Sequence, residues 1–173
     1  MNEKTFDYKG KTITIQEDSD PLNPREDDNI CIIHVGMRHY SFGDENYNTL
    51  EDIEAARIEA EKQGDICLPL YAYCHGGVTI SLSPYACRWD SGQAGFVQIS
   101  RQKMLDEFNK KRFTKALKDR ALSIAQAEVK MLDEYLNNTF YMFNVEGEVV
   151  GGFSSEEDAL EEAKNIVDGM VAA

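Results

Sequence analysis

The chain is organised around the stretch Tyr85-Ala86-Cys87-Arg88-Trp89-Asp90-Ser91-Gly92-Gln93-Ala94-Gly95-Phe96, which holds its only tryptophan. An arginine and an aspartate flank the indole, and two glycines follow. Strand-like runs precede and follow the stretch, at residues 78–82 and 95–99. We therefore interpret it as a loop between two strands, and the neighbouring sequence extends the same pattern in both directions.

Three pairs of strand-like runs are each joined by a glycine-containing turn, which predicts three β-hairpins. The pairs are residues 5–8 with 12–16, 66–74 with 78–82, and 139–146 with 148–153. A further apolar run with β-branched residues, at 29–35, predicts a buried strand. Because hairpins dominate, we expect a largely antiparallel sheet.

Four segments have the apolar spacing of helices, which predicts an α+β fold with three to four helices packed on the sheet. Thr49 with Asp52, and Ser155 with Asp158, have the spacing of capping boxes and begin the first and last helices. A short helix is expected at 101–109 and a long one at 113–135. The apolar stripe of the long helix is formed by Leu117, Ala121, Ile124, Met131 and Tyr135.

A seam is expected at residues 137–138, where two asparagines end the long helix. We assign residues 1–136 to an α+β main domain, and residues 137–173 to a β-hairpin with a C-terminal helix. Because so short a segment buries too little apolar surface to fold well alone, we expect it to dock on the main domain within one continuous domain.

The composition is strongly acidic, with 31 Asp/Glu against 18 Lys/Arg and a net charge of −13. A surface of this charge repels phosphate backbones, so we expect no direct nucleic-acid contact. The charge is uneven, because residues 101–130 carry nine Lys/Arg against four Asp/Glu and the remainder carries nine against 27. Basic residues 110–120 are most simply a solvated helix face. The alternatives are neutralisation by Glu-rich elements of the chain and a nucleic-acid contact.

The four cysteines are best explained as reduced, mostly buried thiols of a cytoplasmic protein. The N-terminal residues lack the apolar core of a signal peptide, and the longest apolar runs are too short to cross a bilayer. A zinc site would need long-range convergence of Cys31, Cys74, Cys87 and a histidine, so we expect no metal. No nucleotide-binding motif is present, and we expect no cofactor.

Cys74 and His75 are adjacent in the sequence and suggest a nucleophile with its base. Neighbouring side chains of a regular strand point to opposite faces, so these two cannot hydrogen-bond to each other. A hydrolase site would need a base and an acid from other elements. The candidates are His34, His39, Asp44 and Asp90. We interpret Cys74 as a core residue and His75 as part of a turn.

The Trp89 stretch has two interpretations. In the functional one, Arg88 stacks on the indole with Asp90 beside it, and this loop, with Gln93, grips a ligand or contacts a partner. In the structural one, Asp90 hydrogen-bonds to the backbone of an Asp-Ser-Gly turn and Trp89 buries its ring as an anchor. Arg88 then pairs with Asp90 or with an acidic loop. The turn chemistry favours the structural interpretation.

The string Arg88-Trp89-Asp90-Ser91-Gly92-Gln93-Ala94-Gly95-Phe96 is the most distinctive motif of the chain. Together with residues 28–31, 38–44, 68–71 and 141–168, it resembles a family of small acidic proteins found in phages, plasmids and integrated elements of bacteria. Two departures are Ser41-Phe42, where Asn-Leu is expected, and Gly151-Gly152-Phe153, which replaces a Cys/Trp-containing string. The resemblance implies a bacterial mobile-element protein and supplies no catalytic residues.

This context leads us to expect a non-enzymatic binding protein that antagonises a host defence or nucleic-acid-handling complex, of the anti-restriction or anti-CRISPR type. The partner would be a host protein or ribonucleoprotein with a basic surface, and a carboxylate-rich surface would contact it, in some cases by mimicking DNA. The candidate carboxylates are Glu26, Asp27, Asp28, Glu51, Asp52, Glu54, Glu59 and Glu61. The alternatives are a phage housekeeping or assembly factor and a small ligand-binding or hydrolytic domain around Trp89.

Overall fold

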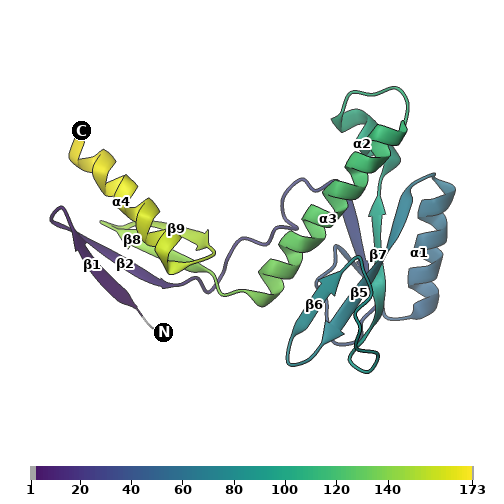
Figure 1. Ribbon diagram of the computed structural model, residues 1–173, viewed down its shortest axis with the longest axis horizontal. Helices are drawn as coiled ribbons and strands as arrows, with labels where there is room; N and C mark the ends of the chain where they lie inside the picture. Colours follow the sequence, from purple (N-terminus) through teal and green to yellow (C-terminus); the bar gives the residue numbers. More distant parts are fainter. Residues whose placement is uncertain (1–2, 173) are drawn as a thin grey trace. The chain divides into compact units, whose positions relative to one another are not determined.

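A computed structural model describes residues 3–172, which form four helices and two mostly antiparallel sheets (Figure 1). The predicted α+β class is confirmed. The elements divide into two compact units: a central unit formed by Pro24–Asn137 and a terminal unit formed by the segments before and after it. Among the described residues, no helix is long and apolar enough to span a membrane.

The central unit contains a five-stranded sheet with strand order β4-β3-β7-β5-β6 and three helices. Its strands are β3 (Cys31–Val35), β4 (Glu45–Asn46), β5 (Ile66–Cys74), β6 (Val78–Ser81) and β7 (Ser91–Ile99). Its helices are α1 (Leu50–Lys62), α2 (Arg101–Glu107) and α3 (Lys115–Asn137). The middle strand is β7, which pairs with β3 on one side and β5 on the other, so the Trp89 stretch leads directly into the centre of the sheet.

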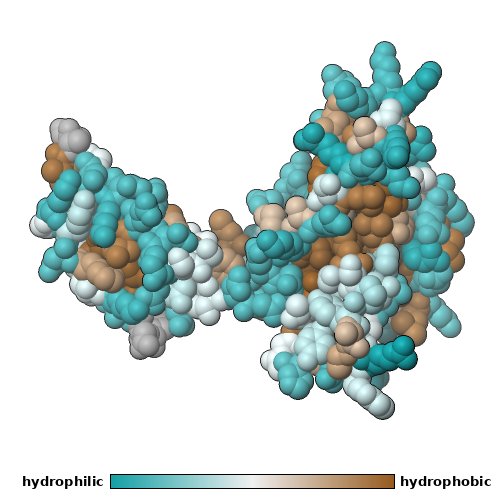
Figure 2. Space-filling model, viewed as in Figure 1, coloured by the Kyte–Doolittle hydropathy of each residue, from teal (hydrophilic) through white to brown (hydrophobic). Residues whose placement is uncertain are grey.

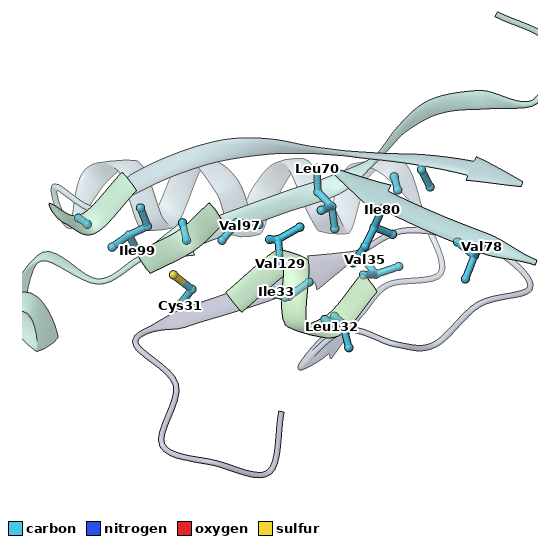
Figure 3. Close-up of a cluster of buried hydrophobic side chains, with 14 of the residues drawn as sticks. Cys31, Ile33, Val35, Leu70, Val78, Ile80, Val97, Ile99, Val129 and Leu132 are labelled. Carbon is cyan, nitrogen blue, oxygen red and sulfur yellow. The ribbon is translucent and has the colours of Figure 1, made fainter. Parts of the chain in front are cut away.

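The main core of the central unit lies between its sheet and α3. Alternate residues of β3, namely Cys31, Ile33 and Val35, belong to this core, as expected when one face of a strand is buried. Figure 3 shows them gathered with apolar side chains of β5, β6 and β7 and with Val129 and Leu132 of α3. The sheet and α3 therefore hold one another in place.

The predicted stripe of α3 is confirmed except at Met131, since Leu117 and Ala121 are buried and Ile124 and Tyr135 pack against the core. The buried positions of the helix are Leu117, Ala121, Ala125, Val129 and Leu132. Met131 is half exposed, while Ile124 and Tyr135 are only partly buried. The buried positions follow one another at intervals of four or three residues, as they must on one face of a helix. One of them, Ala125, was not predicted because its side chain is small and only weakly hydrophobic.

The edge strand β6 is covered by side chains of α3. The Asp133 carboxylate accepts a hydrogen bond of 2.7 Å from the Ile80 amide, and the Asn137 side chain donates one of 3.0 Å to the Val78 carbonyl. These backbone groups lie on the side of β6 that has no neighbouring strand. Because they are already bonded, this edge is blocked from pairing with another chain.

The terminal unit is a four-stranded antiparallel sheet, in the order β1-β2-β8-β9, with one helix packed on it. Its elements are β1 (Lys4–Tyr8), β2 (Lys11–Glu17), β8 (Tyr141–Val145), β9 (Glu148–Phe153) and α4 (Glu156–Ala172). Ile13 and Ile15 of β2 lie opposite Val145 and Phe143 of β8. All four side chains are fully buried with the small apolar residues of α4.

The expected division at residues 137–138 coincides with the junction between the units, but the N-terminal hairpin differs from the prediction. Instead of belonging to a main domain at residues 1–136, β1 and β2 join the C-terminal segment through pairing of β2 with β8. Each hairpin alone is too narrow to bury its apolar face. Joined together, they form a sheet wide enough for α4 to cover.

Candidate functional site

The Trp89 loop, residues 82–90, connects β6 to β7 and exposes its tryptophan almost completely. The side chain of Trp89 is 96% exposed, so the expectation that it anchors the loop by burial is wrong. The backbone of the loop is nevertheless fixed near its end. The Cys74 amide donates a hydrogen bond of 2.7 Å to the Asp90 carbonyl, and the Ser91 hydroxyl donates to the Cys87 carbonyl. A fixed loop thus presents a large apolar ring to solvent.

Asp90 is the residue of this loop that brings other side chains together. Its carboxylate lies 3.7 Å from Nδ1 of His75 and accepts a 3.8 Å hydrogen bond from the Cys87 thiol. Arg88 forms no ion pair with any residue in the described part of the chain, contrary to the structural interpretation of the loop. Arg88 is exposed, like Trp89 next to it in the sequence.

The side chains around Asp90 do not form a catalytic pair of a nucleophile and a general base. The thiol of Cys87 donates to a carboxylate rather than to an imidazole, and the thiol of Cys67 donates to the Arg57 carbonyl. Burial raises the pKa of the Cys31 thiol to about 12 and that of Cys67 to about 11, which keeps both protonated at neutral pH. Within residues 3–172, no cluster of three or more potential ligands could hold a metal ion.

The histidine expected as a base, His34, is a buried structural residue. Its ring stacks on Phe96 with centroids 4.1 Å apart, and its Nε2 lies 2.9 Å from Oε1 of Gln98. Because Nε2 of Gln98 donates to Asp65, Oε1 must accept, which places the proton of His34 on Nε2. Nδ1 then accepts from the Tyr47 hydroxyl at 2.9 Å. The neutral imidazole satisfies every group in this network.

This network predicts a pH dependence of stability. Burial lowers the pKa of His34 from its ordinary value of 6.5, so the unfolded chain binds the proton more readily than the folded one. The free energy of unfolding should therefore fall as the pH is lowered below about 6.5. Urea denaturation at pH 7.5 and 5.5 measures this change in the free energy of unfolding, in the wild type and in His34→Gln for comparison. An equal pH dependence in wild type and variant would assign the effect to other groups.

Asp44, the other candidate acid, belongs to an ion cluster around the covered side chain of Arg25. Arg25 binds Asp44 through two hydrogen bonds of 3.0 and 2.7 Å, and it binds Glu128 of α3 at 2.9 Å. The two carboxylates in turn accept hydrogen bonds from backbone amides of residues 30, 31 and 33. The sequence contains no local signal for this cluster, because its three members come from distant segments.

The expected acidic face of α1 is partly neutralised by its own helix. Arg57 forms ion pairs with Glu54 and Glu61, and Lys62 lies 3.7 Å from Glu59. Asp52 is bonded to the N-cap Thr49. In the preceding loop, Asp28 pairs with Lys103. Of the eight candidate carboxylates, those that form no ion pair or side-chain hydrogen bond among the described residues are Glu26, Asp27 and Glu51.

A groove of about 490 Å³ separates α1 from the first half of β7. Only Ala60 of α1 is buried, and Leu50 at the start of the helix is 80% exposed. The lining residues are Gly36, Leu50, Glu51, Ile53, Glu54, Arg57, Gln93, Ala94, Gly95 and Phe96. Three residues singled out from the sequence, Glu51, Glu54 and Gln93, are thus brought to one groove with an apolar floor.

Comparisons with known proteins found no relative of the chain. No protein-family model, curated protein or solved structure matches the chain. The geometry of the Trp89 loop and of the α1–β7 groove is therefore the structural basis for a proposed contact surface.

Proposed function

We propose that the chain is a protein-binding protein and that Trp89 is the centre of its contact surface. The observation that carries this proposal is the 96% exposure of the indole on a loop whose backbone is fixed by hydrogen bonds. Keeping so large an apolar ring in water brings no stability to the fold. Tryptophan and arginine are the residues that most often dominate binding energy at protein interfaces, and Arg88 adjoins Trp89 here.

The α1–β7 groove supplies the second part of the surface. Gln93, which lines the groove, follows Trp89 by four residues along the chain. The floor is apolar, with Ile53 and Phe96, and Glu51 stands at its rim. A partner segment with an apolar side chain beside a lysine or arginine fits this combination, since the apolar group fills the groove and the cation meets the carboxylate.

The class of partner follows from the resemblance to small acidic proteins of bacterial mobile elements. On this basis we assign the partner to a host defence or nucleic-acid-handling complex with a basic surface, which the chain would block by binding. The acidic remainder of the molecule supports association with such a surface through long-range attraction, which weakens as salt screens it.

Replacing Trp89 by alanine should abolish partner recovery without affecting the fold. Truncation of a central aromatic residue costs roughly 2 kcal/mol or more of binding energy, so recovery should fall at least about tenfold. Because the ring is almost wholly exposed, the unfolding transition should not move. Affinity capture from a bacterial host lysate at low salt, with quantitative mass spectrometry, measures the effect.

The matched control is Met131→Ala, which removes another exposed apolar side chain from the central unit. It should retain every protein that the wild type recovers. A set of recovered proteins that is the same for wild type, Trp89→Ala and Met131→Ala would refute the proposal.

A further inference from the structure

Residues 101–120 carry a cluster of cations that the other residues of the central unit leave almost entirely without ion pairs. The eight members of this basic cluster are Arg101, Lys103, Lys110, Lys111, Arg112, Lys115, Lys118 and Arg120. Among residues 3–172, the only ion pair of the cluster joins Lys103 to Asp28. The other seven cations have no carboxylate within ion-pair distance.

The lysines and arginines outside the cluster behave differently. Of these ten residues, seven form ion pairs: Lys4, Lys9, Lys11, Arg25, Arg57, Lys62 and Lys130. Acidic residues outnumber basic ones 31 to 18 in the chain, so a carboxylate is the usual neighbour of a cation. Within the central unit, neutralisation by Glu-rich elements, one of the expectations for residues 110–120, is therefore not what the structure shows. Apart from Lys103, the cations of the cluster form no ion pair with Asp106, Glu107 or Asp119, which lie among them, or with any other carboxylate of the described residues.

The positions of these cations do not serve the stability of α3. Lys115 and Lys118 lie in the first turn of the helix, which contains no acidic residue. Positive charge at a helix N-terminus opposes the helix dipole, so these lysines are unfavourable for the isolated fold. Two arginines of the cluster pack on aromatic rings. Cζ of Arg120 lies 4.4 Å from the centroid of the Phe108 ring, and Cζ of Arg101 lies 5.6 Å from the centroid of the Phe113 ring. Figure 2 shows hydrophilic side chains projecting from the end that carries α2 and the start of α3.

We propose that the basic cluster binds the phosphate backbone of a nucleic acid. An anion in front of the cluster relieves both the repulsion among the cations and their conflict with the helix dipole. Lysine, arginine and helix N-termini are the groups that contact phosphates in protein–nucleic acid complexes. A nucleic acid is favoured over an acidic protein because duplex DNA carries one charge per roughly 1.7 Å, a density that suits seven unpaired cations within twenty residues of the chain.

The net charge of the chain does not prevent this contact. At physiological ionic strength, charges more than about 8 Å apart are largely screened, so carboxylates beyond that distance act weakly on a ligand at the cluster. The expectation of no nucleic-acid contact was based on the net charge of the whole chain, whereas binding depends on the electrostatic potential close to the ligand. Because the contacts are to phosphate, the binding should be independent of base sequence.

The test is a fluorescence anisotropy titration with labelled oligonucleotides of about 20 nucleotides. Single-stranded and duplex DNA and RNA of two unrelated sequences serve as probes, with salt raised from 50 to 200 mM. Wild type should bind both sequences alike. Neutralising about five phosphates would make log K fall with log salt at a slope of about −3 to −5. The comparison of DNA with RNA and of single strands with duplexes identifies the natural form of the ligand.

The variant Lys111→Gln/Lys115→Gln/Lys118→Gln should bind at least about tenfold more weakly at 50 mM salt, and its slope should be shallower by about two to three. The control Lys9→Gln/Lys62→Gln/Lys130→Gln has the same net charge and should bind like wild type. The cluster variant should remain at least as stable as wild type, since cations have left a helix N-terminus. A loss of binding therefore cannot be assigned to unfolding.

Three outcomes would overturn the proposal. Wild type could fail to bind any probe at 50 mM salt, or the two triple variants could weaken binding equally. Polyglutamate of matched charge could also displace the oligonucleotide as well as unlabelled DNA or RNA does, which would identify an acidic protein as the occupant. Trp89→Ala should leave oligonucleotide binding unchanged, so failure here is distinguishable from failure of the proposed protein-binding surface.

Discussion

Replacing Arg25 by methionine should lower the free energy of unfolding of the central unit by about 3–5 kcal/mol. The side chain of Arg25 is only 6% exposed and joins two carboxylates, Glu128 with a side chain 11% exposed and Asp44 with a side chain 24% exposed. Methionine replaces the aliphatic stem of the arginine but lacks the guanidinium, so it leaves both negative charges without their shared counter-ion. Breaking a buried pair in this way costs far more than the pair itself contributes.

The matched control is Arg57→Met, because Arg57 also bridges two carboxylates, Glu54 and Glu61. That arginine is 33% exposed and its partners lie in solvent, where water replaces the lost contacts. The effect of Arg57→Met should therefore be a small fraction of the effect of Arg25→Met. Urea denaturation followed by circular dichroism measures both variants, and equal losses would contradict the explanation from burial.

Hydrogen exchange gives a local readout of the same substitution. The amides of Ile30 and Cys31 donate to Glu128, and the Ile33 amide donates to Asp44 at 2.6 Å. When the carboxylates separate in Arg25→Met, these three amides should exchange faster than amides of β5. Unchanged protection at all three would mean that the carboxylates keep their positions without the arginine.

Local patterns in the sequence were sufficient to predict most elements of the fold, but not the two-residue strand β4, which has no strand-like pattern. The three hairpins, the strand at 29–35 and the capped helix starts at Thr49 and Ser155 are all confirmed. Each depends on residues close together in the chain, such as a turn glycine or a cap three residues from its amide. The pairing of β2 with β8 could not be predicted in this way, because any half-apolar strand of suitable length would match equally well.

The candidate site shows the same division between local and long-range information. The sequence identified Trp89 and its neighbours but not the exposure of the ring, since an indole is equally compatible with a core and with an interface. The sequence also identified Glu51, Glu54 and Gln93, but only the packing of α1 beside β7 brings them around one groove. Arg25 and Glu128 were missed because their roles depend on contacts between segments far apart in the chain.

Replacing Gly95 by alanine should lower the free energy of unfolding by about 3 kcal/mol, the upper end of the usual cost of overpacking. A Cβ atom at this position would lie 1.9 Å from the His34 carbonyl oxygen and 3.2 Å from Cα of Val35. Both atoms belong to the backbone of β3, so no side-chain rotation can relieve the clash. The two strands must move apart, which breaks pairing at the centre of the sheet.

Gly92→Ala is the matched control, because this glycine lies in the same strand and a Cβ there meets no atom within 4 Å. Its stability should stay unchanged or rise by a few tenths of a kcal/mol, since alanine restricts the unfolded chain more than glycine does. The displacement in Gly95→Ala should also disturb the stacking of His34 on Phe96, which shifts the ring resonances of both residues in NMR spectra. Equal stability of the two variants would show that β3 and β7 can separate without cost. The close approach of the strands would then not be what fixes the floor of the α1–β7 groove.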